Sequence, residues 1–139
     1  MATQVRDLMT PDPILLATTD SAQTAAEKMQ RFGVGAVLVE EAGSLRGIVT
    51  DRDLVTRVIA AGADANELTV GEVITEELST VAPDDPVTEA IGLMREHAVR
   101  RVPVVEDGAA VGILALGDLA VVRDPESLLG EISAANPNA

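Results

Sequence analysis

A threonine and an aspartate three positions apart, Thr50 and Asp53, carry side chains that could bind a ribose phosphate. An aspartate in the first turn of a helix can accept two hydrogen bonds from a ribose diol, and a hydroxyl at a helix N-terminus suits a phosphate. The same spacing is that of a capping box, in which the hydroxyl and the acid satisfy free backbone N–H groups. Capping is our first interpretation of this pair, and ligand binding is compatible with it.

A second copy of this segment follows 65 residues later (112 − 47), where GILALGDL from Gly112 matches GIVTDRDL from Gly47. In this copy Ala115 replaces the threonine, whereas Asp118 keeps the acid. An alanine side chain accepts no hydrogen bond, so we expect no capping box at Asp118, and ribose binding there gains support. The lost hydroxyl weakens the case for a phosphate at this copy.

The chain has few basic residues, so a phosphorylated ligand must bind where they gather. Lys and Arg number 10 against 23 Asp and Glu, which gives a formal net charge of −13. This charge disfavours binding to nucleic acid and to anionic membranes, because both require clusters of Lys and Arg. The candidates for phosphate binding are Arg52, Arg100 and Arg101. Two neighbouring arginines at a strand edge are also typical of a solvated surface.

The sequence contains no pattern typical of catalytic or metal-binding residues. It has no cysteine and one histidine, His97, so we expect no metal site. It has no nucleophile elbow, Walker loop or Gly-rich dinucleotide motif, and we expect that the protein is not an enzyme. No apolar stretch is long enough to span a membrane or to form the core of a signal peptide. We therefore expect a soluble, cytoplasmic protein.

The elements that would position these residues recur with the same 65-residue offset. Apolar residues at i, i+3, i+4 and i+7 predict an amphipathic helix in each copy. Asp20 and Asp85 stand where an N-cap is expected, and Pro86 occupies the predicted first helical position of the second copy. The apolar positions are Ala22, Ala25, Ala26 and Met29 in the first copy and Val87, Ala90, Ile91 and Met94 in the second.

Short β-branched runs on either side of a turn follow each helix and predict a hairpin. A second helix comes next in each copy, and a short apolar strand precedes the first helix. The order is β-α-β-β-α twice, which places the chain in the α/β (α+β) class. The hairpin strands are residues 37–39 and 45–49, joined at Ala42-Gly43, and residues 102–105 and 111–114, joined at Asp107-Gly108. The second helices are residues 53–61, ended by Gly62, and a copy from Asp118 ended by Pro125; the first strands are residues 14–16 and 78–81.

The repeat divides the chain into three parts. Residues 1–64 are the first repeat, residues 65–125 are the second, and residues 126–139 form a C-terminal tail. A chain of 139 residues with 47% hydrophobic residues can bury one core. Because a unit of this size cannot bury its apolar face alone, we expect the repeats to pack as one domain related by a pseudo-two-fold axis.

The repeat register, the Gly-hydrophobic-hydrophobic-Thr-x-x-Asp junction and the hydrophobic-Pro-Val-Val strand resemble the CBS (cystathionine-beta-synthase) repeat. The tandem pair resembles a Bateman module over residues 5–124. The resemblance implies a regulatory module that binds AMP, ADP, ATP, NAD or S-adenosylmethionine in clefts between the repeats and requires no cofactor. It also implies a homodimer, which could act on an unidentified target protein. The alternative function is a ligand-free dimerisation or protein-interaction module.

The resemblance further implies that each cleft takes its Thr and Asp from one repeat and its adenine and phosphate contacts from the other. Gly35 and Ala36 carry no charge, so we expect phosphorylated ligands to bind the second cleft more weakly. The first cleft would combine Thr50, Arg52 and Asp53 with Leu78, Ser79, Val99, Arg100, Arg101 and Pro103. The second would combine Ala115 and Asp118 with Ile14, Leu15, Val34, Gly35 and Ala36.

Overall fold

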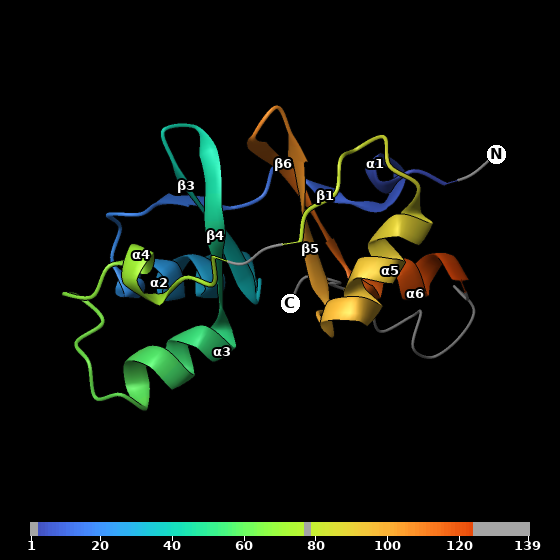
Figure 1. Ribbon diagram of the computed structural model, residues 1–139. Helices are drawn as coiled ribbons and strands as arrows, with labels where there is room; N and C mark the ends of the chain where they lie inside the picture. The colour runs from blue at the N-terminus through green and yellow to red at the C-terminus, as the bar shows by residue number, and fades with distance from the viewer. Residues whose placement is uncertain (1–2, 77–78, 124–139) are drawn as a thin grey trace. The chain divides into compact units, whose positions relative to one another are not determined.

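The chain folds into two compact units, each containing a three-stranded sheet and several helices (Figure 1). A computed structural model describes residues 3–76 and 79–123. One unit contains residues 13–76, and the other contains residues 3–12 together with residues 79–123. The mixed α+β class expected from the sequence is confirmed. The units do not coincide with the sequence repeats, however, because residues 3–12 fold with the second repeat and residues 65–76 fold with the first.

The first unit is built around a sheet with the strand order β2-β3-β4. The first two strands are parallel and the last two form an antiparallel hairpin. The hairpin turn is the predicted Ala42-Gly43 pair, whose φ angles of 53° and 81° suit a two-residue turn that matches the twist of the strands. The elements of this unit are β2 (Leu15–Ala17), α2 (Ala22–Phe32), β3 (Ala36–Glu41), β4 (Ser44–Thr50), α3 (Asp51–Leu54), the π-helical η1 (Val55–Ile59) and α4 (Val70–Val73).

The second unit contains a sheet with the order β1-β6-β5. Strands β5 and β6 form the predicted hairpin at Asp107-Gly108, and the predicted strand over residues 78–81 is reduced to a parallel bridge between Val81 and Val104. Residue 78 lies outside the described residues. The elements of this unit are α1 (Val5–Leu8), β1 (Thr10–Pro11), α5 (Val87–His97), β5 (Arg101–Glu106), β6 (Ala109–Ala115) and α6 (Leu116–Arg123).

Strand β1 comes from the first repeat but pairs with β6 of the second, with Thr10 opposite Ile113 (Figure 1). In the first unit, Thr75 of the second repeat exchanges backbone hydrogen bonds of 3.0 and 3.2 Å with Ile48 of β4. Thr10 and Thr75 are equivalent under the 65-residue offset. Each sheet is therefore extended by a segment that belongs, in sequence, to the other repeat.

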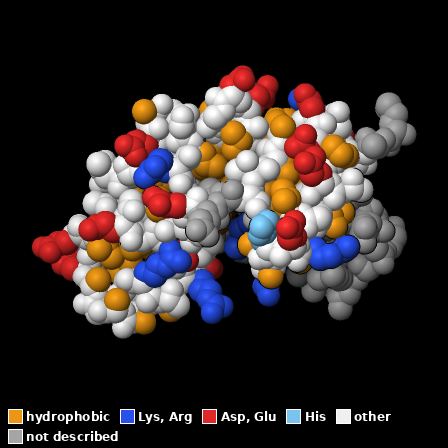
Figure 2. Space-filling model, viewed as in Figure 1, with side chains coloured by type: hydrophobic (Ala, Val, Ile, Leu, Met, Phe, Trp, Pro, Cys, Tyr) orange, Lys and Arg blue, Asp and Glu red, His pale blue; other side chains and the backbone are white. Residues whose placement is uncertain are grey.

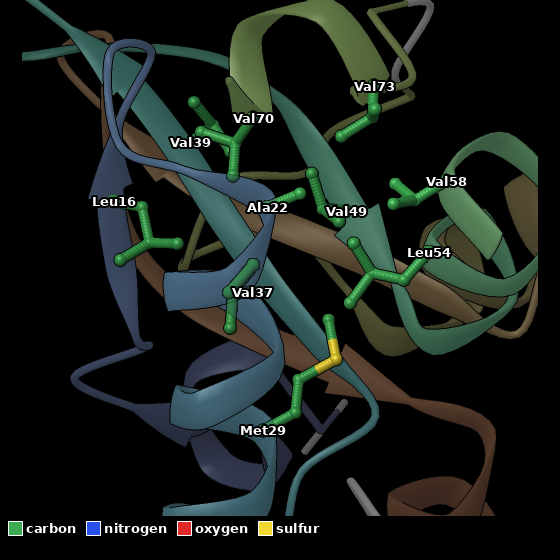
Figure 3. Packing of buried hydrophobic residues seen from close by; sticks show 11 residues of the cluster. Leu16, Ala22, Met29, Val37, Val39, Val49, Leu54, Val58, Val70 and Val73 are labelled. Atoms are coloured by element: carbon green, nitrogen blue, oxygen red, sulfur yellow. The ribbon is translucent and has the colours of Figure 1, made fainter. Parts of the chain in front are cut away.

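The exchanged segments, residues 3–12 and 65–76, also contribute to the two hydrophobic cores. Val70 of α4 is fully buried in the first unit and Val5 of α1 in the second. Burying a side chain of this size stabilises the fold by roughly 1.5–3 kcal/mol. The core of the first unit, shown in Figure 3, comprises Leu16, Ala22, Ala25, Met29, Val37, Val39, Val49, Leu54, Val58, Val70 and Val73. That of the second unit comprises Val5, Val81, Ala90, Met94, Val102, Val104, Leu114 and Leu119. The described residues thus form two cores where the sequence predicts one.

The predicted N-caps of α2 and α5 are corrected by the structure. Ser21, not Asp20, caps α2, since its hydroxyl accepts a hydrogen bond of 3.0 Å from the N–H of Thr24. The Asp20 carboxylate instead accepts from the N–H of Ala17 at 2.9 Å, which closes the turn before the helix. In the second unit, the Asp85 carboxylate accepts from Ala82, and Pro86 is the N-cap of α5 rather than its first helical residue.

The helices after the hairpins start two residues earlier than predicted. The first begins at Asp51 because Thr50 is the N-cap, and the second begins at Leu116. Gly62 follows the first helix with a φ of 70°, as its role as a left-handed terminator requires. The predicted end of the second helix at Pro125 lies outside the described residues.

Candidate functional site

Thr50 and Asp53 form a complete capping box at the start of α3. The Thr50 hydroxyl accepts a hydrogen bond of 3.1 Å from the N–H of Asp53, and Oδ2 of Asp53 accepts one of 2.9 Å from the N–H of Thr50. The capping role expected from the spacing is therefore confirmed. The Asp53 side chain is 13% exposed, so the carboxylate is largely enclosed but still reaches solvent.

Arg57 lies against the other oxygen of this carboxylate and was not among the predicted site residues. Its Nη2 is 3.6 Å from Oδ1 of Asp53, and its Nη1 donates to the backbone carbonyl of Val73 at 2.6 Å. An acid followed four residues later by an arginine is the helix spacing that brings opposite charges together. This spacing was the available signal in the sequence.

The segment before β3 lies beside the start of α3 in the same unit. The N–H of Asp51 donates to the carbonyl of Gly35 at 3.0 Å, and Ala36 is the cross-strand partner of Thr50. Gly35 is buried and Ala36 is partly buried. The structure thus brings the Thr50 end of one predicted cleft next to the Gly35 segment of the other.

Two further residues of the predicted second cleft come from the start of this unit's sheet. The carbonyl of Ile14 accepts from the N–H of Leu38, and Leu15 is 37% exposed on β2. Val34 precedes β3 and is partly buried. Arg52 is exposed in the first turn of α3. Within this unit the apolar and backbone groups of the second cleft therefore accompany the polar groups of the first.

The second unit repeats this arrangement with different side chains. The N–H of Leu116 donates to the carbonyl of Arg100 at 2.8 Å, and Arg101 is the cross-strand partner of Ala115. Arg100 is exposed, whereas Arg101 is half-buried. Val99 is 39% exposed just before them. The two arginines of the first predicted cleft therefore lie beside the start of α6, in the unit that carries Asp118.

The remaining predicted residues of the first cleft differ in their exposure. Pro103 is fully buried in β5, so its side chain serves the packing of the sheet. Ser79 is partly buried, and Leu78 lies outside the described residues. Each predicted cleft combines residues of both units, and the two clefts accordingly stay predictions.

The expectation that Asp118 has no capping role is wrong. Its Oδ2 accepts a hydrogen bond of 2.7 Å from the N–H of Ala115, so half of a capping box persists without a hydroxyl. The reason is that this half uses the backbone N–H of residue 115, which every residue except proline provides. The side chain is buried, with 9% exposure for the residue, and this burial raises the pKa of its carboxyl above the ordinary value.

In residues 3–76 and 79–123, no group of three or more His, Cys, Asp and Glu side chains is placed to hold a metal ion. Over the same part of the chain, no helix has the length and apolar character needed to cross a membrane.

Comparison with known proteins identifies relatives over most of the chain. CBS domain-containing protein YhcV of Bacillus subtilis is 41% identical over 117 residues, which cover 84% of this chain and 83% of YhcV. Hypoxic response protein 1 of Mycobacterium tuberculosis is 34% identical over 119 residues, 85% of this chain and 83% of that protein.

Solved structures resemble the fold over a similar length. The crystal structure of Hypoxic Response Protein I with two coordinated zinc ions matches with a TM-score of 0.78, at 34% identity, over 85% of this chain and 97% of that one. The CBS domain pair of protein MJ0100, in complex with 5′-methylthioadenosine and S-adenosyl-L-methionine, matches with a TM-score of 0.79 at 26% identity. That match covers 91% of this chain and all of the other (100%). The model of the CBS domain matches residues 5–60 and again residues 70–133, and the chain therefore belongs to the CBS domain family, with two CBS domains in tandem.

Proposed function

We propose that this CBS pair is a regulatory module, not an enzyme, and that it binds an adenosine-containing ligand in clefts between its two repeats. The observation that carries the proposal is the Asp53 carboxylate, which is fixed by Thr50 at the start of a helix and still reaches solvent. Support for the ligand class comes from the related MJ0100 pair, which binds two adenosyl compounds. The candidate ligands are AMP, ADP, ATP, NAD and S-adenosylmethionine.

The chemistry of the first site follows from the geometry of this carboxylate. The capping box occupies one lone pair of Oδ2, which leaves acceptor capacity on both oxygens for the two hydroxyls of a ribose. Hydrogen bonds to a charged group are worth roughly 1.5–3 kcal/mol, enough to make the diol a principal anchor. In this proposal Arg52, Arg100 and Arg101 bind the phosphate.

A regulatory role suits the residues better than catalysis does. Asp53 and Thr50 satisfy each other's backbone N–H groups, and neither is paired with a histidine, cysteine or lysine that could act as base or nucleophile within the described residues. Binding without chemistry requires only that the ligand favour one conformation or one partner.

We also propose that the chain forms a homodimer. Ile59 is 73% exposed and Val55 53% exposed on η1, and Figure 2 shows hydrophobic side chains gathered over the region of α3 and η1. Apolar side chains that are exposed together mark interaction surfaces, and two-fold pairing of identical surfaces is the commonest assembly. The same observation favours the second candidate function, a ligand-free dimerisation or protein-interaction module.

A thermal-unfolding screen separates the two functions. Each candidate ligand is added to the wild type and to Asp53→Asn, in which the new amide oxygen can still accept from the N–H of Thr50 and so preserve the cap. A ligand selective for the native state stabilises it by mass action, by roughly 2.7 kcal/mol in unfolding free energy at a hundredfold excess over its Kd, and so raises the unfolding temperature. We expect a shift for the wild type that the variant largely loses. No shift with any candidate, together with no small molecule released from the purified protein, would leave the ligand-free module.

A further inference from the structure

The guanidinium of Arg57 joins the candidate ligand carboxylate to a different part of the first unit. Nη2 lies 3.6 Å from Oδ1 of Asp53, while Nη1 donates to the carbonyl of Val73 at 2.6 Å and to the hydroxyl of Thr75 at 3.3 Å. The planar fork of arginine presents several donors in fixed directions, so one side chain can serve these partners together.

Each partner of Arg57 is itself held in place. Val73 is the last residue of α4 and is 2% exposed, and the final carbonyls of a helix lack partners within that helix. The backbone of Thr75 is hydrogen-bonded to the backbone of Ile48 in β4. Nη1 of Arg57 is therefore held by the end of α4 and by Thr75, and Nη2 faces Asp53.

Each oxygen of Asp53 therefore has its own partner. The N–H of Thr50 donates to Oδ2 at 2.9 Å, and the Arg57 cation faces Oδ1. A carboxylate constrained in this way loses little freedom when a ligand hydroxyl donates to it, and such pre-organisation improves affinity by lowering the entropic cost of binding.

The second copy has no arginine at the position equivalent to Arg57. The 65-residue offset places Val122 where Arg57 stands, and a valine carries neither charge nor donor. Asp118, the equivalent of Asp53, is buried, and its carboxyl pKa is raised by that burial. The two carboxylates thus share a backbone hydrogen bond, but only Asp53 is followed four residues later by an arginine.

We propose that Arg57 is a positioning residue, which orients Asp53 for the two hydroxyls of a ribose and gives the first site its preference for ligands that carry a 2′,3′-diol. This inference rests on the proposed function, because the diol is the group that Asp53 would bind. Arg57 acts through Asp53 and requires no contact with the ligand.

The test compares adenosine with 2′,3′-dideoxyadenosine, which lacks both hydroxyls, by calorimetry. The proteins are the wild type, Arg57→Gln, Arg57→Lys and Asp53→Asn, each checked first for its unfolding temperature. Because the pair is partly exposed, we expect Arg57→Gln to lower the preference for adenosine by about three- to fivefold. Arg57→Lys should lower it as well, because lysine keeps the charge but lacks the planar fork that serves the three partners together. Affinity for the dideoxy compound should not change, and a purely structural role would instead weaken both ligands equally.

The variants distinguish a failure of this inference from a failure of the proposed function. If the wild type has no preference for adenosine, or if Asp53→Asn keeps that preference, the diol site itself is wrong. If Asp53→Asn abolishes the preference but Arg57→Gln leaves it intact or weakens both ligands equally, the diol site stands and the role of Arg57 is overturned. Should Arg57→Gln not fold, a preference that Arg57→Lys leaves intact overturns the inference instead, because lysine lacks the fork.

Discussion

The carbonyl oxygen of Thr75 occupies the space that a side chain on Gly47 would need, since a Cβ at position 47 would lie 2.7 Å from it. The second unit has the same arrangement at Gly112, whose Cβ would lie 3.0 Å from the carbonyl of Thr10 and 2.6 Å from the sulfur of Met9. The glycine in each hairpin strand is therefore what allows the exchanged segment to pack against the sheet.

We expect Gly47→Ala to destabilise the protein by about 1–3 kcal/mol, the usual cost of forcing extra volume into a packed site. The obstacle is a backbone carbonyl bonded to Ile48, which cannot move aside as a flexible side chain would. Urea unfolding measures the change. Gly92→Ala is the matched control, because nothing lies within 4 Å of a Cβ at this exposed position in α5. That substitution should stabilise the helix by roughly 0.5–1 kcal/mol, and equal effects of the two changes would contradict the packing argument.

Asp118 should make stability depend on pH. Its carboxyl pKa in the folded chain is raised above the ordinary value of 3.8, so the folded state binds the proton more tightly than the unfolded state does. Its contribution to stability is complete below that ordinary value and is lost as pH rises through the raised pKa. Asp118→Asn can still accept from Ala115 and carries no charge. We therefore expect it to be more stable than the wild type at pH 7.

The advantage of Asp118→Asn should shrink as the pH falls through the raised pKa. Urea unfolding at a series of pH values between about 4 and 8 follows this difference. Glu96→Gln, at an exposed position of α5, controls for the loss of one surface carboxylate. A stability difference between Asp118→Asn and the wild type that does not vary with pH would contradict the burial of an ionised group.

The two carboxylates should contribute unequally to binding of AMP or ATP. Asp53 has the hydroxyl of Thr50 and the cation of Arg57 beside it, whereas Ala115 replaces the threonine three positions before Asp118. We expect Asp53→Asn to weaken the tighter binding event by about ten- to a hundredfold. Asp118→Asn should leave that event nearly unchanged. Calorimetry on the two variants decides the order, and an equal or larger loss for Asp118→Asn would reverse it.

Ile59 tests the proposed homodimer. Light scattering at micromolar concentration should give twice the 14.4 kDa chain mass for the wild type. Ile59→Asp should shift the mass towards the monomer, since it places a charge on the most exposed large apolar side chain among the described residues. Ile59→Leu keeps the apolar area and should behave as the wild type does. A single 14.4 kDa species for the wild type would refute the dimer.

The parts of the fold that depend on local chemistry could be predicted from the sequence. Ala42-Gly43 and Asp107-Gly108 are turn pairs, and both adopt the positive φ angles that a tight hairpin requires. The capping box of Thr50 and Asp53 was predicted for the same reason, because its partners are three residues apart. Ser21 rather than Asp20 is the N-cap of α2. Both residue types can cap a helix, and the sequence alone does not choose between them.

The exchanged segments could not be predicted, because a pairing between Thr10 and Ile113 leaves no periodic pattern in either stretch. Four-residue helices such as α1 are too short to show one. The available signal was Gly47 and Gly112 at equivalent positions inside strands, since a glycine there often marks a close backbone approach. The cap at Asp118 does not follow from the side chain of Ala115, because the partner of the carboxylate is a backbone N–H.

The exchange of segments also sets an order of assembly during synthesis on the ribosome. Residues 13–76 can complete their unit once the second repeat has begun to emerge. Residues 3–12 leave the ribosome well before β6, yet β1 has no strand partner until β6, which ends at Ala115, has been made. At roughly 5–20 residues per second, this delay is about 5–20 s. Residues 3–12 are therefore translated well before the strand that they pair with, and until that strand is made the apolar side chain of Val5 has no completed core to enter.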